Sequence, residues 1–180
     1  MNVVALYLPQ FHRIKENDEW WGKGHTEWVT VKKGFQKYDG QYQPRVPLNQ
    51  NYYDLTDIQV MDWQTKIAKE HGVNAFCVYH YWFDGKPLLE KPMENYLASN
   101  IDFPYFFCWA NETWTKVWDS EEGSKEVLAS NDYSDKKLWD SHFYYCLDYF
   151  NDTRYIKDHG SCIRRRPAAA GAEQNGRGAV

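Results

Sequence analysis

The chain has 180 residues, of which 18% are aromatic, and a formal net charge of −4 at pH 7. This length suits one ordinary domain with its own core, and the negative charge argues against a nucleic-acid partner, which would need a basic surface. No segment approaches the roughly 18 apolar residues of a membrane helix, and no signal segment precedes the first strand. We therefore expect no membrane span and a cytoplasmic location.

Three short apolar runs, residues 3–9, 73–79 and 103–108, predict β-strands. Hydrogen-bonding and aromatic side chains follow each run directly. Because the carboxyl ends of parallel strands meet at one edge of a sheet, we expect these side chains to form a single site.

A long loop, residues 13–53, separates the first two strands and is typical of a functional segment. Thr56 and Gln59 then form a capping-box pattern that predicts the start of a helix, and Gly72 predicts its end. The residues expected on its buried face are Ile58, Met61, Thr65 and Ala68.

Two further helices are predicted, over residues 88–99 and from Ser134 to Phe150. The apolar stripe of the second one consists of Trp139, Phe143, Cys146, Leu147 and Phe150. Strands alternating with helices indicate an α/β fold with a parallel sheet. We favour a (β/α)8 TIM barrel, of which the first three or so βα units are present. An open doubly wound sheet would place a Gly-rich phosphate-binding turn after its first strand, and this chain has none there.

The composition changes near residue 160. All 32 aromatic residues lie in residues 1–160, whereas residues 161–180 are rich in Ala, Gly and Arg and carry about +3. We therefore expect residues 1–160 to be the N-terminal part of a barrel and residues 161–180 to be a disordered basic tail. We favour the interpretation that this tail is out-of-frame or foreign sequence.

Glu112 is the candidate catalytic carboxylate. It follows the third strand and Asn111, and it lies between Trp109 and Trp114. A carboxyl group in an apolar surrounding keeps its proton and can donate it to the leaving oxygen of a glycosidic bond. The alternative for Glu112 is a surface carboxylate that makes a salt bridge.

Neutral hydrogen-bonding side chains form the rest of the predicted site. Gln10, His12 and His80 each follow a strand, and such groups both donate to and accept from sugar hydroxyls. A metal at these histidines is not expected, because no His-x-His or His-x-x-x-His pair accompanies them. The four cysteines also lack C-x-x-C spacing, so we expect buried free thiols and no cofactor.

Aromatic residues could stack on sugar rings. The candidates are Trp20, Trp21 and Trp28 in the long loop, with Glu27 beside Trp28, and Tyr81 and Trp82 after the second strand. The alternative for the loop tryptophans is a structural role, in which they pin the loop to the rest of the fold.

Several motifs in order resemble the WbsX-like family, which is similar to glycoside hydrolase family 99. The resemblance covers residues 3 to about 160 and rests on Tyr7-Leu8-Pro9-Gln10-Phe11-His12, Asn17-Asp18-Glu19-Trp20-Trp21-Gly22-Lys23-Gly24, Thr26-Glu27-Trp28, Tyr42-Gln43-Pro44, Tyr79-His80-Tyr81-Trp82-Phe83 and Trp109-Ala110-Asn111-Glu112-Thr113-Trp114.

The resemblance implies a (β/α)8 barrel that acts on an oligosaccharide or polysaccharide, encoded among bacterial surface-polysaccharide (lipopolysaccharide, O-antigen) genes. The hydrolase relatives cleave α-mannosidic linkages with retention and use two glutamates in an Asn-Glu-Trp-x-Glu-Gly motif, which this chain lacks. By this analogy Glu112 binds substrate and is not the proton donor.

The leading hypothesis is a truncated carbohydrate-active enzyme that resembles these retaining hydrolases and shows no turnover as it stands. The alternatives are a glycosyltransferase of polysaccharide biosynthesis, a non-catalytic sugar-binding fragment and a degenerate gene product without function.

Overall fold

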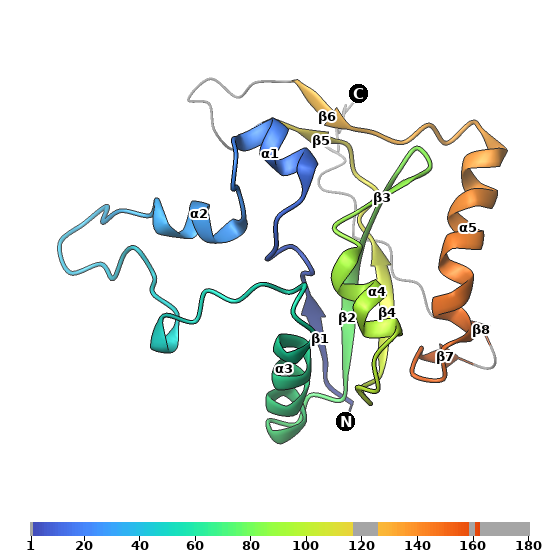
Figure 1. Cartoon of the computed structure of the whole chain (residues 1–180), viewed down its shortest axis with the longest axis horizontal. Coiled ribbons are helices and arrows are strands. Elements are labelled where there is room, and N and C mark those ends of the chain that lie inside the picture. Colours follow the sequence, from blue (N-terminus) through green and yellow to red (C-terminus); the bar gives the residue numbers. More distant parts are fainter. Residues whose placement is uncertain (1, 117–125, 159–160, 163–180) are drawn as a thin grey trace, which may run out of the picture.

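The computed structural model of the chain describes residues 2–116 and 126–158, together with the backbone of residues 161–162. The proposed tail beyond residue 162 lies outside the described residues. The elements (Figure 1) are, in chain order, β1 (Val4–Tyr7), α1 (Lys15–Trp21), α2 (Glu27–Lys32), the 3-10 turn η1 (Leu48–Gln50), α3 (Ile58–Glu70), β2 (Ala75–Phe83), β3 (Lys86–Leu88), α4 (Lys91–Leu97), β4 (Tyr105–Trp109), β5 (Trp114–Thr115), β6 (Val127–Ala129), α5 (Lys136–Asn151), β7 (Lys157–Asp158) and β8 (Ser161–Cys162).

A parallel sheet forms the centre of the fold. The central strand, β2, pairs in parallel with β1 on one side and with β4 on the other. On the far side of β4, Tyr155 makes a further parallel bridge to Tyr105. The α/β class with a parallel sheet is thus confirmed, and the parallel neighbours follow one another in chain order. The residues that the structure describes close no barrel.

Helices α3, α4 and α5 pack on one face of the sheet. Met61 of α3, Tyr96 of α4 and Tyr149 of α5 belong to the same buried cluster as Val78 and Phe107 of the strands. We call this side of the sheet the helix-facing side. It buries most of the apolar surface of the domain, which is the main favourable term in folding.

The first strand leaves apolar groups uncovered on its other side. Val4, Leu6 and Leu8 are 43%, 61% and 42% exposed. Within the described part of the chain, β1 pairs with β2 alone, so its outer edge is also open.

The second strand is longer than the sequence predicted. It continues through His80, Tyr81 and Trp82 to Phe83, because β3 folds back on it as an antiparallel hairpin. Asp84 and Gly85 both have positive φ at the turn, as a two-residue hairpin of this kind requires. The predicted site residues after this strand therefore lie within it, and their side chains alternate between its two sides.

The helix starts differ by one residue from the predicted caps. Asp57 caps α3 by accepting a hydrogen bond from the Gln59 amide, so the expected Thr56 capping box is wrong. Asp135 caps α5 in the same way, and the hydroxyl of Ser134, the predicted cap, donates to Asp132 instead. Gly72, with φ of +78°, follows the end of α3 as predicted.

The buried face of α3 is the predicted one, because Met61, Thr65 and Ala68 are buried and Ile58 is partly buried. The stripe predicted for α5 is only half right. Cys146 and Phe150 are buried, but Trp139 and Phe143 are 41% and 46% exposed. The other buried residues of α5 are His142 and Tyr149.

Three further expectations have clear outcomes. The helix predicted over residues 88–99 is shorter, because Leu88 still belongs to β3 and α4 begins only just before Pro92. Cys77, Cys108 and Cys146 are buried as expected, and the Cys162 side chain lies outside the described residues. Among the described helices, none combines the length and apolarity needed to cross a lipid bilayer.

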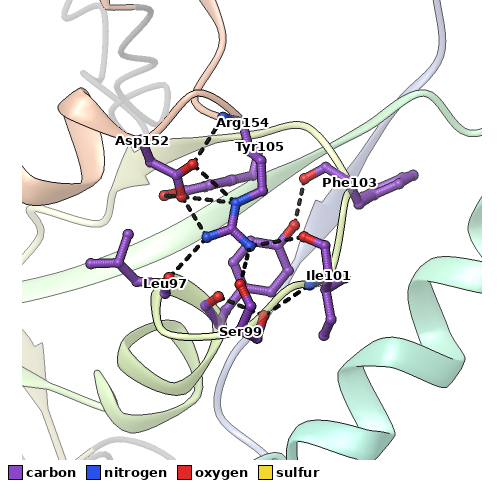
Figure 2. Close-up of polar contacts among 8 residues, drawn as sticks. Leu97, Ser99, Ile101, Phe103, Tyr105, Asp152 and Arg154 are labelled. Atoms are coloured by element: carbon purple, nitrogen blue, oxygen red, sulfur yellow. Dashed lines mark hydrogen bonds and ion pairs between the residues drawn. The ribbon is translucent and has the colours of Figure 1, made fainter.

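A cluster of hydrogen bonds around Arg154 fixes the far edge of the sheet (Figure 2). Its guanidinium donates to the Asp152 carboxylate at 2.7 Å and to the backbone carbonyls of Leu97, Ser99 and Ile101. These carbonyls lie at the end of α4 and just beyond it, where a helix leaves acceptors without partners. Burial alone would raise the pKa of Asp152, but the hydrogen bonds and charge of Arg154 outweigh it and lower that pKa.

Candidate functional site

The alternation of β2 divides the predicted site residues between the two sides of the sheet. Tyr81 and Phe83 pack against the Trp114 ring with centroid distances of 5.1 Å. His80 instead stacks on Phe107, at 4.8 Å, on the helix-facing side. The residues expected to form a single site therefore lie in two separate groups, one on each side of the sheet.

On the side away from the helices, Tyr81 is the centre of a polar group. The Gln10 side-chain amide, which follows β1, donates a hydrogen bond of 2.7 Å to the Tyr81 hydroxyl. This contact links the segment that follows β1 to the neighbouring parallel strand β2. Because Tyr81 accepts from Gln10, its own hydroxyl proton remains available to an acceptor.

Glu27 contributes a protonatable carboxyl group to this region. It is the first residue of α2 and is half-buried. Burial raises its pKa to about 7, and its Oε2 atom has no hydrogen-bond partner among the described residues. At neutral pH the carboxyl is therefore protonated about half of the time and can either donate or accept.

Glu112 lies on the same side but in a different environment. Its residue is exposed at the end of β4. Burial is the main reason why the pKa of Tyr81 is raised, and the neighbouring charges of Tyr79, Glu27 and Glu112 add to the rise. Both glutamates thus lie near the Tyr81 hydroxyl. The burial that was expected to raise the pKa of Glu112 is found instead at Glu27.

We call Gln10, Glu27, Tyr81 and Glu112, with the Trp114 ring over Tyr81, the Tyr81 site. Its groups can hold hydroxyls by donating and accepting hydrogen bonds. It also offers an aromatic face and one carboxyl group that gains and loses a proton near pH 7.

His12 is a buried polar residue at the end of the segment that follows β1. It is 1% exposed, and neither ring nitrogen has a hydrogen-bond partner among the described residues. Burial lowers the pKa of His12, so the ring is neutral at pH 7. A neutral imidazole of this kind offers one donor and one acceptor to a hydroxyl group or a water molecule.

Trp28 holds the long loop in place. Its indole nitrogen donates to the Tyr53 carbonyl at 2.8 Å, and its ring packs on Phe11, Tyr52 and Tyr53. The structure thus places Trp28 in the arrangement expected for a loop pin. The backbone carbonyl of Asn111 accepts a hydrogen bond of 2.6 Å from the Tyr133 hydroxyl, which helps to hold this residue in position.

The second group of predicted residues packs against α5. The Trp82 and Trp109 rings contact the His142 ring at 4.9 and 4.5 Å, and His80 Nε2 lies 2.9 Å from His142 Nε2. Cys146 Sγ lies 3.8 Å from the same His80 atom. His142 and Cys146 were not predicted as partners of His80. Their spacing of four residues places them on one face of a helix, and this pattern could have indicated a common contact.

Comparison with known proteins adds the family. A protein-family model described as "Glycosyltransferase WbsX" matches residues 3–164. Two curated relatives from Xanthomonas campestris pv. campestris, strains B100 and ATCC 33913, are each described as "Uncharacterized protein WxcX" and are 50% identical over 118 residues. The matched region covers 65% of this chain but only 17% of each relative. No solved structure matches the chain.

Proposed function

The chain belongs to the WbsX glycosyltransferase family, and on that premise we propose that it binds a saccharide at the Tyr81 site as part of a carbohydrate-active enzyme of polysaccharide metabolism. This proposal rests mainly on the hydrogen bond of 2.7 Å that the Gln10 side-chain amide donates to the Tyr81 hydroxyl. The Glu27 carboxyl, whose pKa is about 7, lies near this hydroxyl.

The chemistry of the site suits a sugar. Each sugar hydroxyl both donates and accepts, and the Gln10 amide, the Tyr81 hydroxyl and the half-protonated Glu27 carboxyl match this need. The Trp114 ring, packed at 5.1 Å on Tyr81, supplies the flat apolar surface that sugar rings favour.

We also propose that the sheet is the first part of a (β/α)8 barrel. Its parallel neighbours follow chain order, from β1 through β2 and β4 to Tyr155, and α3, α4 and α5 pack on one face. A doubly wound sheet would place helices on both faces. In a barrel the Tyr81 side would face inward, where barrel enzymes bind their ligands at the carboxyl ends of the strands.

For the reaction, we assign the proton-holding role to Glu27 and substrate binding to Glu112. A group that exchanges a proton near pH 7 is suited to general acid or base catalysis. This assignment fits a retaining glycoside hydrolase of the kind that the sequence resembles, and it fits a glycosyltransferase equally well. Release of free sugar from a glycoside would indicate hydrolysis. Transfer from a nucleotide-sugar to an acceptor would indicate the transferase.

Binding is tested first, by titrating the 180-residue chain with manno-oligosaccharides and following tryptophan fluorescence and heat. We expect saturable binding that weakens about tenfold in Tyr81→Phe, since a buried hydrogen bond to a ligand contributes about 1.4 kcal/mol or more. Tyr144→Phe, at a tyrosine that is 68% exposed on α5, is the matched control and should bind as the wild type does. Equal affinity in Tyr81→Phe, or no saturable signal in the folded wild type, would refute the proposal.

A further inference from the structure

The helix-facing side holds a compact group of nitrogen and sulfur donors. His80 comes from β2, and His142 and Cys146 come from successive turns of α5. Their donor atoms all lie within 4.8 Å of one another, and the three residues are 7%, 9% and 4% exposed. We propose that these residues form a binding site for a divalent metal ion of the zinc type, independent of the saccharide site proposed above.

The spacing of the donor atoms fits the size of such an ion. Zinc binds imidazole nitrogen at about 2.0–2.1 Å and thiolate sulfur at about 2.3 Å, so tetrahedral geometry separates two nitrogens by roughly 3.3 Å and nitrogen from sulfur by roughly 3.6 Å. The His80 and His142 Nε2 atoms are 2.9 Å apart, and Cys146 Sγ lies 3.8 Å from His80 Nε2. All three donor atoms lie within 4.8 Å of one another, so side-chain shifts of about an ångström bring them into a common coordination sphere.

The donor types favour a borderline-soft ion. Two imidazoles and one thiolate suit zinc, whereas magnesium and calcium prefer oxygen ligands. In the structure the two Nε2 atoms meet at hydrogen-bonding distance, so one of them carries a proton. On metal binding this proton would move to the Nδ1 atom of the same ring, and the Cys146 thiol would release its proton, leaving two neutral imidazoles and one thiolate around the ion.

Aromatic rings hold the two imidazoles in place. Phe107 stacks on the His80 ring at 4.8 Å, and Trp82 stacks on the His142 ring at 4.9 Å. These rings restrict the imidazoles and lower the local polarity, which strengthens metal–ligand attraction. His142 also lines a small surface pocket with Trp82, Trp109 and Trp139, among others.

Three protein ligands leave a fourth position for water or another ligand, as in zinc sites that are not closed. The ion would also link α5 to β2, which are joined here by residues 62 positions apart in the chain. Binding would therefore stabilise the packing of α5 on the sheet, because any ligand that binds only the folded state stabilises it.

The first experiment uses the full 180-residue chain, stripped with a chelator and dialysed against zinc or cobalt chloride. We expect about one ion per chain by mass spectrometry of the metal content. We also expect a thiolate-to-cobalt charge-transfer band in the near-ultraviolet spectrum of the cobalt form. Bound cobalt without this band, or no retained metal, would overturn the proposal without any variant.

Variants then assign the ligands. Cys146→Ser should abolish the charge-transfer band and weaken zinc binding at least tenfold, and His142→Ala should weaken binding by a similar factor. Cys77→Ser is the control, because Cys77 is a buried thiol in the same strand as His80 but outside the donor group. Circular dichroism checks that each variant is folded. An unchanged band and affinity in folded Cys146→Ser would exclude this site.

Discussion

The two sides of β2 differ in what their side chains contact. On the helix-facing side, alternate residues such as Phe76 and Val78 are enclosed by three helices in one apolar cluster. On the other side, Tyr81 meets an amide from the neighbouring strand and lies near two glutamates. One strand thus supplies a packed core with one set of side chains and a polar site with the other, and a shift of one residue would exchange the two roles.

The two sides of the sheet are therefore expected to contribute to different properties, one to stability and the other to ligand binding. Substitutions that remove contacts on the helix-facing side or at the edge of the sheet should lower the free energy of unfolding at any pH. Substitutions in the Tyr81 site should change binding or the pH dependence of stability. The three predictions below test this division, from the largest expected effect to the smallest.

The largest effect is expected at Arg154. Arg154→Met leaves the Asp152 carboxylate without its cation and three backbone carbonyls without their donor, at a site where the two side chains are only 13% and 7% exposed. We expect a loss of about 3 kcal/mol in the free energy of unfolding, measured with urea. Arg13→Met breaks the ion pair with Asp18, in which the Arg13 side chain is 55% exposed. This substitution should lower the free energy of unfolding by about 1 kcal/mol or less. Equal losses in the two variants would contradict this ranking.

An intermediate effect is expected at Glu27 and depends on pH. Because the pKa of Glu27 is raised from 4.5 to about 7 on folding, the folded state binds its proton more tightly than the unfolded chain does. The stability of the wild type should therefore fall as pH rises from 4.5 through 7. Glu27→Gln removes this loss and should be more stable than the wild type by about 1–2 kcal/mol at pH 8, allowing for partial solvent screening.

Denaturant titrations across this pH range measure the effect. Glu70→Gln, at an exposed glutamate of α3, is the control and should keep the pH dependence of the wild type. If Glu27→Gln also kept the pH dependence of the wild type, burial would not raise the pKa of the Glu27 carboxyl in solution.

The smallest effect concerns the start of α3 on the helix-facing side. Asp57→Ala removes the carboxylate that accepts from the Gln59 amide and should cost about 1 kcal/mol. Thr56→Ala should cost less than about 0.5 kcal/mol, because this residue is exposed and does not cap the helix. Thermal unfolding of the two variants compares them directly, and a larger loss in Thr56→Ala would restore the capping box predicted from sequence.

Local patterns in the sequence were sufficient to find β1, β2 and β4 and helices α3, α4 and α5, but not α1 and α2, which lie in the segment predicted as a loop. The apolar runs of β1, β2 and β4 and the buried face of α3 follow from side-chain periodicity alone. The end of β2 was missed because it depends on the hairpin with β3, although the Asp84-Gly85 pair is a strong hairpin signal.

The candidate site was predictable only in part. Gln10 and Tyr81 were identified because both follow apolar runs, and the structure joins them. The raised pKa of Glu27 depends on how α2 and the long loop pack, which no local pattern contains. His80 and Tyr81 are adjacent in the chain but face opposite sides of the sheet. This could not be predicted from the sequence, because the predicted strand ended before these two residues.

The uncovered row of Val4, Leu6 and Leu8 has a practical consequence for handling the protein. It lies on a strand whose outer edge is open within the described part of the chain, and such an edge accepts a strand from any neighbouring molecule. Concentrated solutions of this chain should therefore self-associate through β1 before they do so through any helix. A lysine at position 6 would place a charge in the middle of that row and should raise the concentration at which the protein stays monodisperse.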